Sequence, residues 1–343
     1  MQVHHYGDSP EFRDIGEGIS VISLPQPFYD NNNVYLIDGD EPVLIDSGYV
    51  QSLGLLQAAL RKKKLSLAKI KKVFYTHDHV DHITASLVLR SYSPARHYGM
   101  LGMSEHVGNY SRHLERMQMA MNRLVYKANS DYDKRRALKE KAQASFIRFL
   151  DAVKADSKVD PVLKMDVELQ EGDVVSIGKR ELGFIYTPGH NRWHLTPYLI
   201  GEGIYFTGDL VLKNISSVYA EVDGNLQHYK ESLSRLLQLP VRRLLPAHGE
   251  EPVNPQRAIK ILMRTIGILE RGVLARLQEG YTDLRQMTVS AMGEKVEESS
   301  YYPTALAVMH SFIAKYRALG AIEIDERDPP YECYRLKADY ELT

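Results

Sequence analysis

Short apolar runs separated by polar turn residues dominate the first hundred positions of the chain. The runs at 20–25, 33–38 and 42–46 are rich in Val, Ile and Leu and are bounded by Pro, Asn, Gly and Asp, a pattern typical of strands. Between 49 and 64 the apolar positions recur at helical spacing, and the segment ends in basic residues suited to a helix C-terminus. The run at 71–76 predicts another buried strand. Strand, helix and strand in this order indicate an α/β layered fold.

A long segment, 103–157, interrupts this pattern of strands. It favours helix and is rich in Met, Arg and Lys, so it predicts two helices inserted between strands. Its eleven Lys and Arg against seven Asp and Glu would attract an anionic substrate, although basic residues on helices usually form a solvated face. Its Met and Tyr side chains fit an acyl tunnel less well than the core of a helix pair or a homodimer contact.

Strands resume after the insert, and helices dominate the end of the chain. Apolar runs predict a helix at 226–239 and strands at 173–178, 181–187, 195–200, 203–209 and 241–249. From 255 to 319 the spacing is mostly helical, and a hairpin closes the chain. We therefore expect a large α/β domain over 1–255 and a small, mostly helical, winged-helix-like domain over 256–343.

Composition narrows the class of protein. The 343 residues are 44% hydrophobic and 25% charged with a net charge of -1, which gives no general attraction to nucleic acid or to a membrane. One cysteine excludes an internal disulfide framework and fits a reducing cytosol, so we expect a cytoplasmic protein. The first residues do not resemble a signal peptide, and no apolar run has the length needed to span a bilayer.

Three histidines and two aspartates occupy six consecutive positions, HDHVDH. His77 and His79 alternate, so they share a face on an extended segment, and Asp81 and His82 follow where the strand enters a helix. Imidazole and carboxylate groups together suit zinc, iron or manganese. A surface patch of hydrogen-bonded histidines is a poor alternative, because burying several unpaired ionisable groups is costly. Asp78 should point away from the two histidines, toward solvent or toward the groups that support the ligands.

Three further strand ends finish in a ligand-type residue beside glycine. TPGH ends in His190, TGD ends in Asp209, and PAHG contains His248. A single His or Asp in a turn is usually solvated or acts as a cap. Four strand ends of this kind, counted with HDHVDH, are hard to explain by turn chemistry alone.

THDHVDH, TPGH, TGD and PAHG, in this order and preceded by LIDSG at 44–48, resemble the motifs of the metallo-β-lactamase superfamily of hydrolases, with glyoxalase II as the nearest pattern. The resemblance covers about residues 15–255. It implies an αββα sandwich of the α/β class, with metals between the two sheets at one edge. The domain over 1–255 would then be catalytic and would carry the insert.

The resemblance also implies a role for each motif residue. The implied metal ligands are His77, His79 and His190 for one metal, Asp81, His82 and His248 for a second, and Asp209 as the bridge. Asp46 would orient ligand groups without binding metal. His194 would lie near the metals as a substrate or supporting group, or would only pack with Trp193. Asp81 or Asp209 would take a proton during catalysis.

The expected cofactors are two divalent metal ions, zinc in preference to iron or manganese, which lower the pKa of a shared water. We expect a small-molecule substrate that is a thioester, ester or lactone, for example a coenzyme A or glutathione thioester. A mononuclear iron persulfide dioxygenase of the same superfamily is the alternative, and a metal-containing binding protein stays open. A nuclease is disfavoured, because 281–343 holds seven Lys and Arg against eleven Asp and Glu and nucleic acid requires a basic face.

Overall fold

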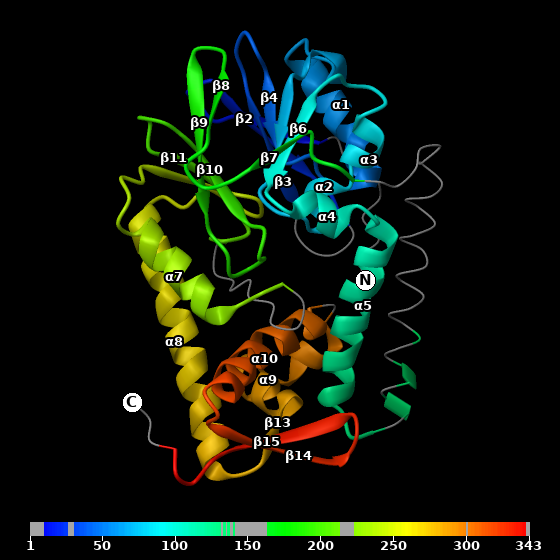
Figure 1. The fold of residues 1–343 in the computed structure, drawn as a ribbon, viewed down its shortest axis with the longest axis vertical. Helices are drawn as coiled ribbons and strands as arrows, with labels where there is room; N and C mark the ends of the chain where they lie inside the picture. The colour runs from blue at the N-terminus through cyan, green and yellow to red at the C-terminus, as the bar shows by residue number, and fades with distance from the viewer. Residues whose placement is uncertain are drawn as a thin grey trace.

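The computed structural model of the protein describes residues 10–26, 31–131, 163–212, 223–299 and 301–340, together with 133, 134, 136, 137 and 140. Two β-sheets form the upper part of the molecule, and a helical part with a small third sheet lies below them (Figure 1).

The first sheet has seven strands in the described part of the chain. In sheet order they are β1 (Glu11–Asp14), β2 (Ile19–Leu24), β3 (Asn32–Ile37), β4 (Val43–Ile45), β5 (Lys72–Phe74), β6 (Arg96–Met100) and β7 (Val167–Leu169). Strands β1 to β4 pair antiparallel, and β4 to β7 pair parallel. The parallel half therefore directs the C-terminal ends of β4 and β5 to the same edge of the sheet.

The second sheet has five strands among the described residues. In sheet order they are β12 (Arg243–Pro246), β11 (Ile204–Gly208), β10 (Leu195–Leu199), β9 (Arg180–Tyr186) and β8 (Val174–Ile177). Only the pair of β11 and β12 is parallel within this set. The ends of β11 and β12 thus also lie at one edge.

Helices cover the outer face of each sheet. With the first sheet lie α1 (Leu53–Lys62), α2 (Val80–Ile83), α3 (Ser86–Leu89), α4 (Met103–Val107), the start of α5 (Tyr110–Lys127) and the 3-10 turns η1 (Val50–Ser52) and η2 (Leu67–Lys69). With the second sheet lies α7 (Leu226–Leu236). The remaining elements are α8 (Pro255–Glu279), β13 (Thr282–Asp283), α9 (Leu284–Met292), η3 (Glu294–Glu298), α10 (Tyr302–Ala318), β14 (Ile322–Asp328) and β15 (Tyr331–Leu336).

Three helices begin at an asparagine that accepts a backbone N–H of the first turn. The side chain of Asn109 caps α5 at 3.0 Å, that of Asn225 caps α7 at 2.9 Å, and that of Asn254 caps α8 at 2.8 Å. Each cap of this kind stabilises a helix by about 1 kcal/mol. Pro255 at the first position of α8 adds a backbone angle that already suits a helix.

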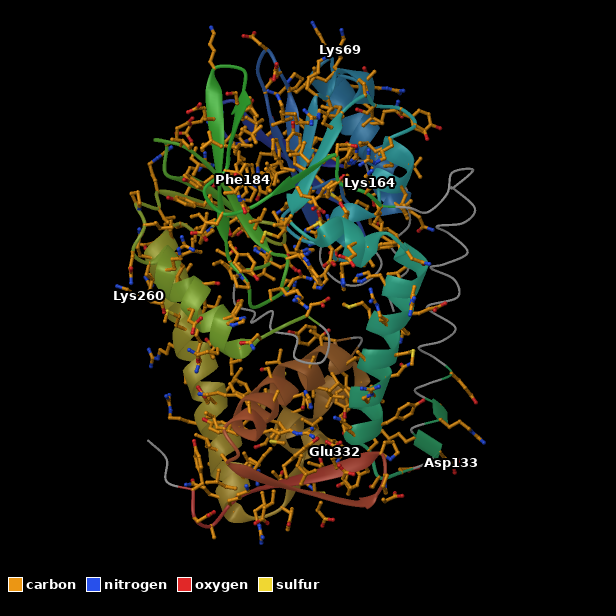
Figure 2. The ribbon with its side chains drawn as sticks, viewed as in Figure 1. Lys69, Asp133, Lys164, Phe184, Lys260 and Glu332 are labelled. Carbon is orange, nitrogen blue, oxygen red and sulfur yellow. The ribbon has the colours of Figure 1, made fainter. Side chains whose placement is uncertain are left out.

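The buried apolar residues form three clusters that match the layers of an αββα sandwich. The cluster between the two sheets includes Phe74, Phe184 and Phe206, and Figure 2 labels Phe184 within the upper part of the molecule. A second cluster lies between the first sheet and its helices, and a third lies between the second sheet and the helices that follow. The fold is therefore the αββα sandwich of the α/β class that the motif resemblance implied.

Two long helices connect the sandwich to the third sheet. Helices α5 and α8 run down opposite sides of the molecule, with α9 and α10 between them (Figure 1). Nζ of Lys127, at the end of α5, lies 3.3 Å from Oε1 of Glu332 on β15. Figure 2 labels Glu332 in the lower part of the molecule, away from the sandwich. The division at 255 stays a prediction, because Leu233 of α7 and Phe312 of α10 belong to one apolar cluster.

The predicted strands and helices of the sandwich agree with the observed ones to within a few residues. Strands β1, β6 and β7 were not predicted; β6 contains His97 and Gly99, β1 is mostly polar, and β7 has only three residues. In the insert, α4 and α5 account for the first predicted helix, while most of the second lies outside the described residues. No helix among the described residues is both long and apolar enough to cross a membrane.

Candidate metal centre

The loop that follows β5 carries four of the predicted ligands. His77 and His79 come directly after the strand, and His79 precedes the first residue of α2. Asp81 and His82 lie on that short helix, as the sequence predicted. All four side chains are buried, with exposed fractions between 0% and 9%. Ionisable groups that are buried together in this way require partners or a bound ion.

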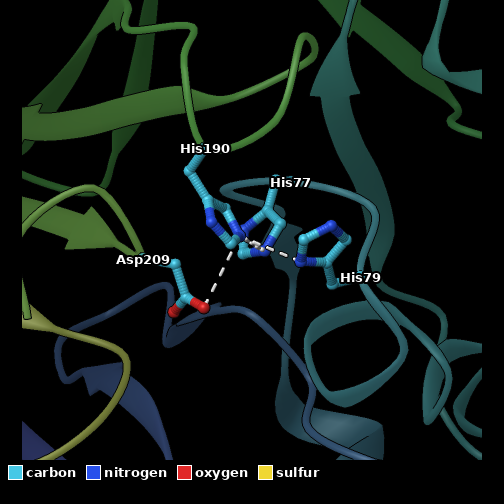
Figure 3. A group of neighbouring side chains, drawn as sticks. All are labelled: His77, His79, His190 and Asp209. Atoms are coloured by element: carbon cyan, nitrogen blue, oxygen red, sulfur yellow. Dashed lines mark hydrogen bonds and ion pairs between the residues drawn. The ribbon is translucent and has the colours of Figure 1, made fainter. Parts of the chain in front are cut away.

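Three histidines and one aspartate form the first group of ligand-type atoms. His190, which lies between β9 and β10, has its Nε2 atom 3.3 Å from Nε2 of His77 and 2.9 Å from Nδ1 of His79. The same Nε2 atom lies 3.6 Å from Oδ2 of Asp209, which directly follows β11 (Figure 3). The first sheet and the second sheet thus each contribute residues to this group.

Asp81, His82 and His248 form the second group. Nε2 of His248 lies 3.2 Å from Oδ2 of Asp81, and Nε2 of His82 lies 3.7 Å from Oδ1 of Asp81. Oδ1 of Asp209 lies 3.5 Å from Nε2 of His82 and 3.4 Å from Nε2 of His248. The two carboxylate oxygens of Asp209 therefore face the two groups separately.

The distances within both groups suit ligands that surround an ion. Zinc binds imidazole nitrogen and carboxylate oxygen at about 2.0–2.2 Å in tetrahedral geometry, so two of its ligand atoms lie about 3.4 Å apart. The described atoms lie between 2.9 and 3.7 Å apart. Both donor sets, histidine nitrogen with carboxylate oxygen, also fit a divalent metal.

A family model for the metallo-beta-lactamase superfamily matches residues 28–248 of the chain. This segment runs from just before β3 to the last residue of the second group, and it covers more than half of the sequence. The chain belongs to the metallo-beta-lactamase superfamily. The motif resemblance found in the sequence is thereby confirmed at the level of the family.

Curated relatives in this superfamily include two kinds of thioester enzymes. A hydroxyacylglutathione hydrolase of Chelativorans sp. (strain BNC1) is 34% identical over 145 residues, which are 40% of this chain and 52% of that protein. The acyl-coenzyme A thioesterase MBLAC2 of Homo sapiens is 27% identical over 252 residues, which are 69% of this chain and 80% of that protein. The chain spans about half the length of the first of these relatives.

Solved structures show the same fold over almost the whole chain. A beta-lactamase domain protein from Burkholderia ambifaria superposes with a TM-score of 0.74 at 19% identity, over 98% of this chain and 96% of that one. A metallo-beta-lactamase family protein from Thermus thermophilus gives a TM-score of 0.70 at 22% identity, over 94% and 100%. The helical part that follows the sandwich is therefore included in the shared fold.

In three histidines of the candidate centre, the ring nitrogen that faces away from the ligand group, Nδ1, lies within hydrogen-bonding distance of an oxygen atom. Nδ1 of His77 lies 3.1 Å from Oγ1 of Thr76, and Nδ1 of His248 lies 3.0 Å from the backbone oxygen of Asn31. Nδ1 of His82 lies 2.9 Å from Oδ2 of Asp46. Such contacts fix the proton on the outer nitrogen and leave the inner nitrogen available for a metal.

Asp46 lies where the superfamily resemblance implied a supporting carboxylate. Besides its contact with His82, it accepts a hydrogen bond from the backbone N–H of Thr76 at 2.8 Å and one from the Thr76 hydroxyl at 2.9 Å. Its backbone adopts a φ of 60°, in the left-handed region that few residues other than Gly, Asn and Asp occupy. This uncommon backbone conformation is kept beside the candidate ligands, where it fixes the direction of the Asp46 carboxylate.

Two motif glycines allow the strand ends to approach their neighbours. A Cβ atom on Gly189 of TPGH would lie 2.3 Å from the Cα atom of Tyr229 in α7. A Cβ atom on Gly208 of TGD would lie within 2.8 Å of Thr76 and of His194, and this glycine has a φ of 48°. Glycine is therefore required for packing at both ends, which explains its place beside the ligand-type residues.

Burial and charge divide the histidines of the centre into two kinds. Burial lowers the pKa of His77 and of His79, and neighbouring imidazoles lower it further. Burial also opposes the charged form of His82, but the carboxylates of Asp81, Asp46 and Asp209 outweigh it and raise the pKa of His82. The first group thus consists mainly of neutral imidazoles, and the second lies in a strongly negative environment that suits a cation.

At two positions the sequence left two alternatives open, and the geometry favours one of them at each. Asp78 does not point to solvent: its side chain is fully buried, and Oδ1 accepts a hydrogen bond of 2.6 Å from Asn191. His194 does not pair with Trp193, because its ring stacks on His77 while the Trp193 ring stacks on His106. Nδ1 of His194 lies 2.9 Å from the Thr187 hydroxyl, so the His194 ring is held in its place against His77 of the first group.

Sequence reasoning anticipated Asp46 beside His82 but missed the partners of the outer nitrogens of His77 and His248. Thr76 directly precedes HDHVDH, and a hydroxyl beside a ligand motif was a usable signal. The backbone oxygen of Asn31 gives no such signal, because every residue has one. The contact depends on the bridge between Asn32 and His248, which joins the two sheets.

Proposed function

We propose that this protein is a metal-dependent hydrolase that cleaves thioesters with a pair of divalent metal ions. The observation that carries the proposal is the position of Asp209, with one oxygen toward each of two ligand groups. A carboxylate in this position can bridge two ions about 3.5–4 Å apart, the spacing of two-metal hydrolytic sites. Each group offers its own histidines, so neither ion depends on the bridge alone.

Zinc is the proposed metal. Neutral imidazoles with one or two carboxylates suit zinc, while iron and manganese accept the same donors. When bound, the two ions supply Lewis acidity and lower the pKa of a water toward neutrality. The chain then needs no serine or cysteine nucleophile, and its one cysteine, Cys333, lies on β15 of the third sheet.

The side chains of the centre have separate tasks in the proposed reaction. His77, His79 and His190 hold one face of the site, and their burial excludes bulk water. Asp81 and Asp209 are the candidate proton carriers, because they are the two carboxylates of the candidate centre. Water adds to the thioester carbonyl, the carbon–sulfur bond breaks, and the leaving thiolate takes a proton to give an acid and a thiol.

The relatives support a thioester as the substrate class. One is a hydroxyacylglutathione hydrolase and another is an acyl-coenzyme A thioesterase. Both names describe an acyl group joined to an anionic thiol carrier, which agrees with the basic excess of the insert. We therefore propose an anionic thioester rather than a lactone or a simple ester.

The test combines metal content with a substrate panel. The purified chain is analysed for zinc, iron and manganese, and is then assayed for thiol release from acyl-coenzyme A and hydroxyacylglutathione thioesters and for lactone opening. We expect two equivalents of metal at the centre and thiol release from one of the thioester series. His79→Ala should lose metal and activity, whereas His228→Ala, at an exposed position on α7, should keep both.

Three results would contradict the proposal. One equivalent of iron, together with oxygen uptake in the presence of a persulfide, would move the assignment to the dioxygenase class. Full metal content and full activity in His79→Ala would show that the candidate centre is not the reaction site. Binding of the thioesters without turnover would leave a metal-containing binding protein.

A further inference from the structure

A third group of ligand-type side chains lies outside the candidate centre. It consists of Asp78, His106 and His113, whose ligand atoms all lie within 4.8 Å of one another. The three residues come from the loop after β5, from α4 and from α5. Asp78 and His113 are 0% and 1% exposed, and the His106 side chain is 14% exposed. Three separate segments thus direct ionisable groups to one buried point.

The distances in this group are those of ligands that share an ion. Oδ2 of Asp78 lies 3.3 Å from Nε2 of His106 and 3.9 Å from Nε2 of His113. A charged hydrogen bond between such atoms would be about 2.7–2.9 Å long. Ligands of a tetrahedral zinc ion lie about 3.4 Å apart, and the corresponding distances in the candidate centre extend to 3.7 Å. The spacing therefore favours a bound ion over direct hydrogen bonds.

A second carboxylate borders the same point. Oδ2 of Asp223 lies 3.8 Å from Nε2 of His106, and its side chain is 6% exposed. Oδ2 of Asp78, Nε2 of His106 and Oδ2 of Asp223 are all buried and make no hydrogen bond among the described residues. Buried carboxylates and imidazoles that make no hydrogen bond are costly unless a bound ion compensates them.

We propose that Asp78, His106 and His113 bind a third divalent metal ion, zinc by its donor set, with the Asp223 carboxylate beside His106 as a neighbouring negative charge. Two imidazoles and a carboxylate are among the ligand sets that zinc accepts. The proposal goes beyond the hydrolase activity, and it holds whether or not the candidate centre turns over a thioester. Asp78 lies between His77 and His79 in the loop after β5, so the third site and the candidate centre share this loop.

Neighbouring side chains hold the ligands of this third site in place. Asn191 donates a hydrogen bond of 2.6 Å to Oδ1 of Asp78, which leaves Oδ2 directed at the site. The ring of Trp193 stacks on His106 with centroids 3.7 Å apart. Contacts of this kind orient ligands before the metal arrives. Both residues belong to the loop that also carries His190, so the second sheet supports the third site as well.

The structural role of such an ion follows from the elements that it would join. The loop after β5 carries the candidate ligands, and α5 continues from the site to the third sheet beside β15 (Figure 1). An ion bound to Asp78, His106 and His113 would cross-link these elements. It would thus fix the helical insert against the loop of the candidate centre.

The test locates the metal directly. The protein is purified from zinc-supplemented cells, dialysed against metal-free buffer and crystallised, and anomalous maps are measured above and below the zinc edge. We expect a peak between Asp78, His106 and His113, in addition to those at the candidate centre. Zinc per chain should fall by one equivalent in His106→Gln and in His113→Gln, and should stay at the wild-type value in His228→Gln.

The outcomes separate this proposal from the proposed function. An anomalous peak at the third site in an enzyme without thioesterase activity would support the third site and contradict only the function. Peaks at the candidate centre with none at the third site would overturn the third site alone. Unchanged zinc content in both glutamine variants would overturn it too, and if a variant fails to fold, the wild-type map decides.

Discussion

Asp46→Asn offers the most direct test of how the candidate centre is built. The variant keeps the size of the side chain, and asparagine tolerates the left-handed backbone that Asp46 adopts at a φ of 60°. Its carbonyl oxygen can still accept the hydrogen bond from the backbone N–H of Thr76. Its amide group, however, replaces the oxygen that lies 2.9 Å from Nδ1 of His82. The amide donates a hydrogen bond and cannot accept one.

The consequence for His82 is a change of tautomer. With an amide donor at Nδ1, the imidazole must carry its proton on Nε2, the atom that faces Asp81 and Asp209. A protonated nitrogen cannot bind a metal. Loss of such a supporting partner typically costs about 10–100-fold in metal affinity, which corresponds to about 1.4–2.8 kcal/mol. The loss should be confined to the group that contains His82.

The assay is a competition between the protein and a chelator of known zinc affinity. The wild type should release the two ions of the candidate centre in steps that are both tight, and Asp46→Asn should release one of these two about 10–100-fold more easily. Asp40→Asn, the same change at an exposed carboxylate after β3, is the matched control and should match the wild type. Unchanged release of both ions from a folded Asp46→Asn protein would refute the reasoning.

Three further variants test other parts of the structure. Asp209→Asn should lower kcat, measured with saturating zinc, by more than about 100-fold, since loss of a residue that only supports a ligand costs up to about 100-fold. A smaller loss would exclude the bridging role. Gly208→Ala should lower the free energy of unfolding, measured in urea, by about 2–4 kcal/mol, because Gly208 has a positive φ and close contacts. Gly201 has a positive φ but open space around it, so Gly201→Ala should lower the same quantity by about 1 kcal/mol. Burial would raise the pKa of Glu270, but ion pairs with lysines of α7 and α10 outweigh it and lower the pKa. Glu270→Gln should therefore cost about 1–2 kcal/mol at pH 7, and this difference should shrink as the pH falls below the ordinary value of 4.5 and through the lowered pKa. A difference that does not depend on pH would contradict the ion pairs.

The motifs of the candidate centre were predictable because each lies at a strand end beside glycine. His190, Asp209 and His248 follow β9, β11 and β12 within a few residues, so the strand pattern of the sequence already placed them at sheet edges. The structure brings these three residues together with the HDHVDH segment in the groups that the family resemblance implied. Their role as metal ligands stays a prediction until metal is measured.

The third site could not be predicted from the sequence in the same way. His106 and His113 lie on helices, at positions where a histidine is usually structural, and their spacing shows no ligand pattern. Their convergence with Asp78 depends on how α4 and α5 cross the loop after β5, which is a matter of tertiary packing. The short strands β6 and β7 were missed for a related reason, because the pairing of β6 with β5 and of β7 with β6 fixes them more than their own residues do.

The chain order of the candidate ligands has a consequence for biosynthesis. The loop after β5 is translated first, His190 and Asp209 come much later, and His248 is last. An emerging chain therefore carries the four candidate ligands of the HDHVDH segment long before the second sheet exists to supply the others. Full loading of the second group has to wait for His248, which follows β12, so a centre with both groups loaded marks a chain in which β12 has already paired with β11.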